Sequence, residues 1–78
     1  MTNTILNMAA TYFYDPRLKQ TEDGYFEINV FKHTKKENIL VDTISYPDYK
    51  AVLRQAQDVV NTLNSKTPQG KHLRKIYS

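Results

Sequence analysis

The residues best suited to acid–base chemistry are two histidines, His33 and His72, each of which follows a lysine in the sequence. Because an imidazole gains and loses a proton near neutral pH, such a pair could cleave RNA by general acid–base catalysis, with a lysine or Tyr77 assisting. Histidines in flexible, charged segments are far more often bystanders than catalysts. We therefore keep a small nuclease as the third-ranked hypothesis and predict that the chain is not an enzyme.

The sequence lacks the other common catalytic and cofactor-binding patterns. With no cysteine, the chain has neither a disulfide framework nor a thiolate zinc site nor a cysteine nucleophile. Its two glycines stand alone, so no glycine-rich loop can hold a phosphate, and no histidine or carboxylate pair has the spacing of a metal site. No serine stands in a recognisable nucleophile–base pattern. The sequence therefore predicts no catalytic residue, no metal and no cofactor.

Basic residues are concentrated in two short segments of a chain whose net charge is +3. Residues 32–36 contribute +3 and residues 66–78 contribute +4, whereas residues 1–31 and 37–65 each carry −2. If the two basic segments meet in space, they form a basic pole suited to a phosphate backbone or an acidic protein surface. The alternative is a solvated set of charges that keeps a small domain soluble. The predicted partner-binding residues of this pole are Lys32, His33, Lys35, Lys36, Lys66, Lys71, His72, Arg74 and Lys75.

A helix over residues 46–64 organises the predicted fold. At about 100° per residue its apolar side chains fall in one stripe. The stripe consists of Tyr49, Val52, Leu53, Ala56, Val59, Val60 and Leu63. Ser45 can cap this helix, Pro47 suits its first turn, and Asp48 stands at the positive end of its dipole. A single apolar stripe needs one face of a sheet to cover it.

Three stretches before this helix are predicted to be strands. Residues 4–14 alternate weakly, and residues 25–33 alternate clearly. Residues 17–24 between them are predicted to be a polar loop, and residues 34–38 a Lys-rich hairpin loop. The third strand, residues 39–46, has an ambiguous register. Its candidate faces are Ile39, Val41 and Thr43, or Leu40, Ile44 and Tyr46, with Asp42 arguing against burial of the second set.

The predicted fold is α+β in one small domain, residues 1–78: a three-stranded antiparallel meander with one long C-terminal amphipathic helix on one face. An eight-residue strand and a helix of about 17 residues have similar lengths, about 26 and 25 Å. A helix that packs back along the third strand therefore returns its C-terminus to the hairpin. This path brings the two basic segments together.

Residues 66–78 are predicted to form a basic C-terminal tail. Pro68 and Gly70 are expected to stop extension of the long helix. The spacing of Leu73, Ile76 and Tyr77 fits either a short terminal helix or an extended, docked segment.

An aromatic sheet face is the second predicted partner-binding surface, with Phe13, Tyr25 and Phe31 pointing to solvent if the opposite face of the sheet meets the helix. Exposed aromatic side chains stack on unpaired bases or bury against a protein. We favour a protein, because Glu27 lies between Tyr25 and Phe31 and would repel a phosphate backbone. The unprotected edge of residues 4–14 also offers a route to a homodimer.

Two stretches, TEDGYFEINV and DTISYPDYKAVLRQAQDVVNTL, carry a resemblance to the N-terminal domain of HicB-type antitoxins. That family has an acidic-Gly turn, a strand pair and an Ala-containing helix at similar spacing, but a Pro-Gly stretch where this chain has FKHTKKEN. The β-β-β-α order is also similar to the end of a double-stranded-RNA-binding domain, although here the helix opens with YPDYK rather than a lysine cluster. These resemblances imply an antitoxin-like partner protein or an RNA-binding domain.

These features favour a small non-enzymatic protein that binds a macromolecular partner and regulates or inhibits it. Small regulators of this size include phage- or mobile-element-encoded inhibitors such as anti-CRISPR proteins, so a protein or ribonucleoprotein is the expected partner. Direct binding of RNA or DNA through the Lys-rich hairpin and tail is the alternative. No apolar run approaches the roughly 18 residues of a membrane span, and the N-terminus lacks the basic region of a signal peptide. We therefore expect a cytoplasmic protein with no membrane contact.

Overall fold

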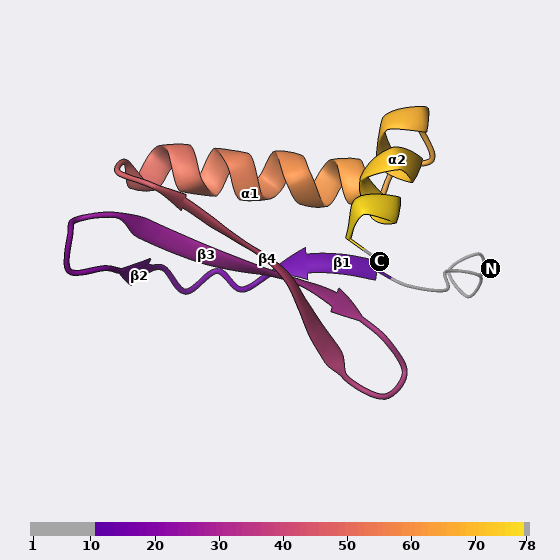
Figure 1. Cartoon of the computed structure of the whole chain (residues 1–78), viewed down its shortest axis with the longest axis horizontal. Helices are drawn as coiled ribbons and strands as arrows, with labels where there is room; N and C mark the ends of the chain where they lie inside the picture. Colours follow the sequence, from indigo (N-terminus) through magenta and orange to yellow (C-terminus); the bar gives the residue numbers. More distant parts are fainter. Residues whose placement is uncertain (1–10, 78) are drawn as a thin grey trace.

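The structure is a computed structural model that describes residues 11–77. Within these residues one antiparallel sheet lies against a long helix, and a shorter helix stands at the end of the long one (Figure 1). The predicted α+β class and the order of strands followed by a long helix are confirmed. Residues 4–10 of the first predicted strand lie outside the described residues. In the described part of the chain, neither helix is long and apolar enough to cross a membrane.

The centre of the sheet is β3 (Phe26–His33), which pairs with β4 (Asn38–Tyr46) along one side. Along its other side, β3 pairs first with β1 (Thr11–Tyr14) and then with β2 (Lys19–Gln20). β1 lies opposite the C-terminal half of β3, and β2 lies opposite its N-terminal end. Together β1 and β2 act as one interrupted edge strand.

The strand β2 was not predicted, because its residues were assigned to a polar loop. Asp15 still donates its N–H to the carbonyl oxygen of Asn29 on β3 (3.0 Å), but Pro16 has no N–H and interrupts the pairing. The chain rejoins β3 at Lys19, and both residues of β2 are exposed. Only backbone pairing defines this strand, so no apolar alternation marks it in the sequence.

A β-bulge in β4 explains why its register was ambiguous. The pairing with β3 shifts at Val41, which has no cross-strand partner. One extra residue reverses which side chains face the helix on either side of it. Ile44 is therefore buried beneath the helix, whereas Leu40 lies beside Phe31 on the opposite face. Neither candidate face is buried as a whole.

The long helix α1 (Tyr49–Leu63) packs against β1, β3 and β4 and buries four residues of its predicted stripe, Val52, Ala56, Val60 and Leu63. Of the other three, Leu53 and Val59 are half-buried and Tyr49 is exposed. The buried core consists of Tyr12, Ile28, Val30, Ile44, Val52, Ala56, Val60 and Leu63. The helix begins later than predicted, because Asp48 rather than Ser45 is the N-cap, and its Oδ2 accepts the N–H of Ala51 (3.2 Å). Pro47 therefore precedes the helix instead of standing in its first turn.

The C-terminal residues form a second helix, α2 (Pro68–Ile76), which packs on α1. The predicted short terminal helix is confirmed over the docked extended segment. Pro68 opens α2, and the hydroxyl oxygen of Thr67 caps it by accepting the N–H of Gly70 (3.1 Å). Gly70 is buried, and a methyl group there would collide with the carbonyl oxygen of Thr62 and lie 2.8 Å from that of Ser65. Glycine thus permits close contact with the end of α1 rather than stopping a helix.

Candidate partner-binding surfaces

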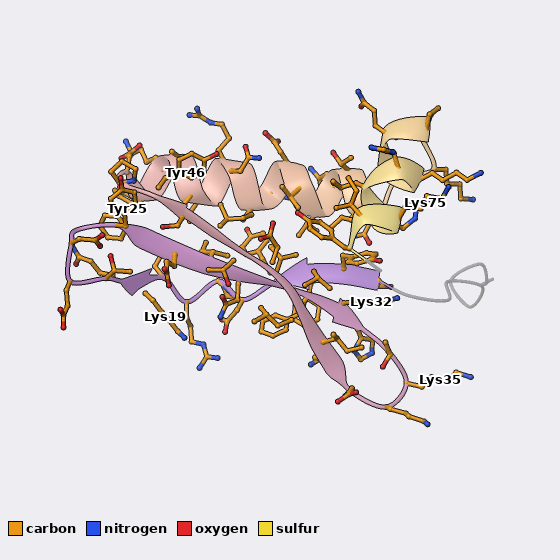
Figure 2. All side chains as sticks on the ribbon, in the orientation of Figure 1. Lys19, Tyr25, Lys32, Lys35, Tyr46 and Lys75 are labelled. Atoms are coloured by element: carbon orange, nitrogen blue, oxygen red, sulfur yellow. The ribbon has the colours of Figure 1, made fainter. Side chains whose placement is uncertain are left out.

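The two basic segments lie at the same end of the molecule but on diverging elements. Lys32, Lys35 and Lys75 occupy the end opposite Tyr25 in Figure 2. The β3–β4 hairpin carries Lys35 away from α1, whereas α2 carries Lys75 and packs on α1 (Figures 1 and 2). The predicted basic pole is therefore divided between a hairpin tip and a helix, and we call both together the basic end. Its exposed members are His33, Lys35, Lys36, Lys66, Lys71, His72 and Lys75.

Arg74 is held within the fold rather than offered at the surface. Its Nη1 donates to the carbonyl oxygen of Leu63 (2.7 Å) and to that of Ser65 (2.6 Å). The side chain thereby satisfies carbonyl groups at the C-terminus of α1 that have no helical partner, and its charge complements the helix dipole. We assign Arg74 a structural role in joining α1 to α2.

The structure does not assemble the histidines into an acid–base pair. His33 Nδ1 lies 2.7 Å from Asn38 Oδ1, and His72 is exposed on α2. Tyr77 donates its hydroxyl proton to Asp42 Oδ2 (2.6 Å), and burial together with this bond raises the pKa of Tyr77 to about 12. Among residues 11–77, no group of three His, Cys, Asp or Glu residues is placed to hold a metal ion. The nuclease hypothesis gains no support from this arrangement.

The sheet face that α1 leaves uncovered carries an aromatic pair. Phe13 and Phe31 are direct cross-strand partners whose stacked rings have centroids 5.5 Å apart and planes 21° apart. Leu40 lies beside Phe31 on the next strand and is 53% exposed. We call Phe13, Phe31 and Leu40 the open-face cluster.

A hollow of about 320 Å³ adjoins the open-face cluster and is rimmed by Asp15 and Arg17. Arg17 Nη2 lies 2.7 Å from Asp15 Oδ2, and its Nε donates to Oδ1 at 3.0 Å. These hydrogen bonds lower the pKa of Asp15 to about 2. The Arg17 side chain is 86% exposed, so its guanidinium remains accessible beside the aromatic rings.

Tyr25, the third aromatic residue predicted for the sheet face, lies at the other end of the molecule. Figure 2 shows it at the same end as Tyr46, away from the basic end. Tyr25, Tyr46 and Tyr49 are each roughly two-fifths exposed, and the ring of Tyr49 meets that of Phe26 edge-on at 6.1 Å. The sequence predicted one aromatic surface, but its residues lie in two separate places on the molecule.

The outer edge of β1 is partly closed by a side chain from α1's C-terminus. Asn64 Oδ1 accepts the N–H of Tyr12 (2.8 Å), and Asn64 Nδ2 donates to the carbonyl oxygen of Tyr12 (2.9 Å). The amide thus occupies both backbone groups of a residue that another strand would need. Along residues 11–14, this contact corrects the prediction of an unprotected edge; residues 4–10 of that predicted edge lie outside the described part.

A groove of about 560 Å³ runs between the outer edge of β4 and the helices. Residues 42–46 of β4 form one wall, and α1 forms the other with Asp58, Val59 and Thr62. Leu73 of α2 and Tyr77, which follows α2, also line it. The sequence reasoning missed this groove, although Asp42 in the middle of an apolar strand was a signal of a special environment.

Comparison with protein-family models, curated proteins and solved structures finds no match for the chain.

Proposed function

We propose that this chain is a small interaction protein that binds a protein or ribonucleoprotein partner through the open face of its sheet. The observation that supports the proposal is the open-face cluster, Phe13, Phe31 and Leu40, on a face that neither described helix covers. Aromatic side chains with apolar neighbours supply much of the binding energy at protein interfaces. The exposed lysines of the hairpin continue from the same strands and would steer an acidic partner toward this face.

On this proposal the protein acts by occupying or bridging its partner rather than by catalysis. Blocking a partner's surface requires a rigid face and complementary charge, which a sheet backed by α1 and a basic hairpin supply. An inhibitor of the anti-CRISPR kind or an antitoxin-like partner would work in this way.

Direct binding of single-stranded RNA or DNA is the second candidate. The observation that favours it is the position of Arg17 beside the stacked pair of Phe13 and Phe31, with hairpin lysines following β3. Aromatic rings flanked by cations bind unpaired bases by stacking and bind their phosphates by charge. Glu27, which lies on the same face as Phe31, weighs against this candidate.

The first experiment is capture of partners by the tagged chain from host lysate, with and without nuclease, followed by mass spectrometry. The affinity of the captured partner is then measured for Phe31→Thr and for Lys35→Gln/Lys36→Gln, with Lys50→Gln, an exposed position on α1 away from the open face, as the control. A thermal melt of each variant confirms that it is folded.

The proposal predicts a nuclease-resistant protein partner whose affinity falls at least about tenfold with Phe31→Thr, with a modest dependence on salt. Recovery of nucleic acid alone, with affinity that falls steeply with salt and mainly with the lysine variant, would favour the second candidate. Equal affinity of the Phe31 variant and the control would contradict both.

A further inference from the structure

The groove between β4 and α1 is a surface distinct from the open-face cluster. Among residues 11–77, no strand pairs with the outer side of β4, so this edge of the sheet is open. At the opposite edge of the sheet, on β1, Asn64 binds the outward N–H and carbonyl oxygen of Tyr12. The two edges therefore differ in what they offer to another chain.

The backbone of β4 presents hydrogen-bonding groups along this groove. The carbonyl oxygen of Asn29 accepts the N–H of Asp15 on the β1 side of β3. The backbone groups of Asn29 therefore point away from β4. Its partner Thr43 therefore points its N–H and carbonyl groups outward, and the N–H donates to Asp42 Oδ1 (2.8 Å). Because these groups alternate along a strand, those of Ser45 also point outward.

The dimensions of the groove fit an extended chain. Five residues of β4, 42–46, line it, which corresponds to about 16 Å of strand. α1 stands back from this edge and offers Val59 as an apolar contact, and Leu73 of α2 adds a second. A strand added to β4 would therefore lie between a hydrogen-bonding edge and a helix, as in other cases of peptide recognition by strand addition.

The charge of the groove restricts its ligand. Asp42 and Asp58 line it, and none of its lining residues is a lysine, arginine or histidine. Asp42 Oδ1 accepts the N–H of Thr43. In a complex, a carbonyl group of the added strand would accept this N–H instead. That exchange would leave Asp42 Oδ1 free to accept a hydrogen bond from a cation.

We propose that this groove binds an extended, basic peptide segment of a partner protein, which pairs with β4 through Thr43 and Ser45 and places a lysine or arginine beside Asp42 and Asp58. A second copy of this chain is a poorer occupant. A two-fold contact between β4 strands would bring the acidic groove of one copy against that of the other, and like charges at such a contact oppose pairing.

The test uses a phage-displayed library of random decapeptides panned on the full chain and on two variants. Ser45→Pro blocks the outward edge without removing a bond to β3, because the N–H of Ser45 points away from that strand. Ser45→Ala is the matched control that keeps the N–H. The most enriched peptide is then titrated into the ¹⁵N-labelled protein, and Asp58→Asn is compared with the parent chain.

We expect enrichment, on the parent chain and Ser45→Ala, of peptides that alternate basic with β-branched or aliphatic residues. Binding should fall at least about tenfold with Ser45→Pro and about threefold to fivefold with Asp58→Asn, and the amide signals of Thr43 and Ser45 should shift.

Four results would overturn the proposal: no enrichment, enrichment of acidic peptides, unchanged binding by a folded Ser45→Pro variant, or amide shifts confined to the hairpin. A concentration-dependent dimer of the parent chain that Ser45→Pro abolishes would instead assign the edge to a second copy.

Discussion

Three polar side chains hold the ends of elements together in this protein. Arg74 binds the last carbonyl group of α1 and that of Ser65 beyond it, Asn64 binds the edge of β1, and Asp42 joins β4 to Tyr77 at the end of α2. Arg74 and Asn64 bind backbone groups that secondary structure leaves without a partner, and Asp42 accepts the hydroxyl proton of Tyr77.

The contact between Tyr77 and Asp42 predicts how stability depends on pH. Burial, and secondarily the bond to Asp42, raises the pKa of Tyr77 from 10.0 to about 12. The folded chain therefore holds this proton more tightly than the unfolded chain. The resulting stabilisation is fully present below about pH 10 and is lost as the pH rises toward 12.

We expect Tyr77→Phe to lower the free energy of unfolding at neutral pH by about 1–2 kcal/mol, because it removes the hydrogen bond to Asp42. It should also flatten the loss of stability between about pH 10 and pH 12. Urea denaturation across this pH range measures both effects, with Tyr46→Phe as the exposed control. A Tyr77→Phe variant that loses as much stability over this range as the parent chain would show that another group titrates there.

At the scale of elements, two irregularities create the candidate surfaces. The bulge at Val41 turns Leu40 onto the open face beside Phe31 while keeping Ile44 in the core. The close approach of α2 to α1 brings Tyr77 to β4 and completes the lining of the groove. Both irregularities depend on backbone geometry rather than on hydrophobic patterning.

Gly70→Ala tests the contact between α1 and α2. In an exposed helix this substitution would stabilise by about 1 kcal/mol, because alanine has the higher helix propensity. Here the added methyl group meets the backbone carbonyl groups of Thr62 and Ser65, which cannot move aside cheaply. We expect a decrease of about 1–3 kcal/mol in the free energy of unfolding, measured by chemical denaturation.

The control for this change is Gln69→Ala, on the exposed side of α2. It should leave the stability within about 0.5 kcal/mol of the parent chain. A Gly70→Ala variant as stable as this control would mean that α2 does not sit against α1 as described.

Positive charge is concentrated at one end of the molecule. The hairpin tip and α2 form this basic end, and exposed tyrosines lie at the opposite end (Figure 2). A concentration of basic residues at one end attracts an acidic partner through the local electric field, even when the net charge of the molecule is small. The open-face cluster and the β4 groove lie on different sides of the same sheet, so one partner need not occupy both.

A comparison of two double variants tests whether the basic end acts as a patch. Lys35→Gln/Lys36→Gln removes two charges at the hairpin tip, and Lys19→Gln/Lys50→Gln removes two elsewhere. We expect the hairpin variant to elute from a heparin column at lower salt, because clustered cations bind a polyanion cooperatively. Equal elution would show that heparin responds to the net charge alone.

Much of the fold could be predicted from the sequence because it depends on local periodicity. The stripe on α1 and the alternation of Phe26, Ile28 and Val30 correctly indicated which faces meet. The spacing of apolar residues near Leu73 allowed two conformations, and one of them was the helix that formed. These signals are visible in the sequence because the period of a helix or strand determines which side chains share a face.

The candidate surfaces could be predicted from the sequence only in part. Phe13 and Phe31 were identified because strand alternation places them on the uncovered face, but Tyr25, predicted for the same face, lies at the other end of the molecule. Arg17 was overlooked because its position depends on the turn at Asp15 and Pro16, which no periodicity describes. Arg74 was counted as a surface charge because its bonds to α1 join residues of different elements.

The sequence by itself determined the α+β class, the helix that covers the sheet, and the concentration of positive charge in two segments, since each follows from composition or local period. Only the tertiary structure decided that β4 bulges at Val41, that Gly70 serves a helix contact, and that within residues 11–77 β4 keeps an open edge while Asn64 closes part of the other. These outcomes depend on backbone groups and side chains that are distant in sequence and meet only after folding. No pattern along one element records which distant partner will satisfy a hydrogen bond.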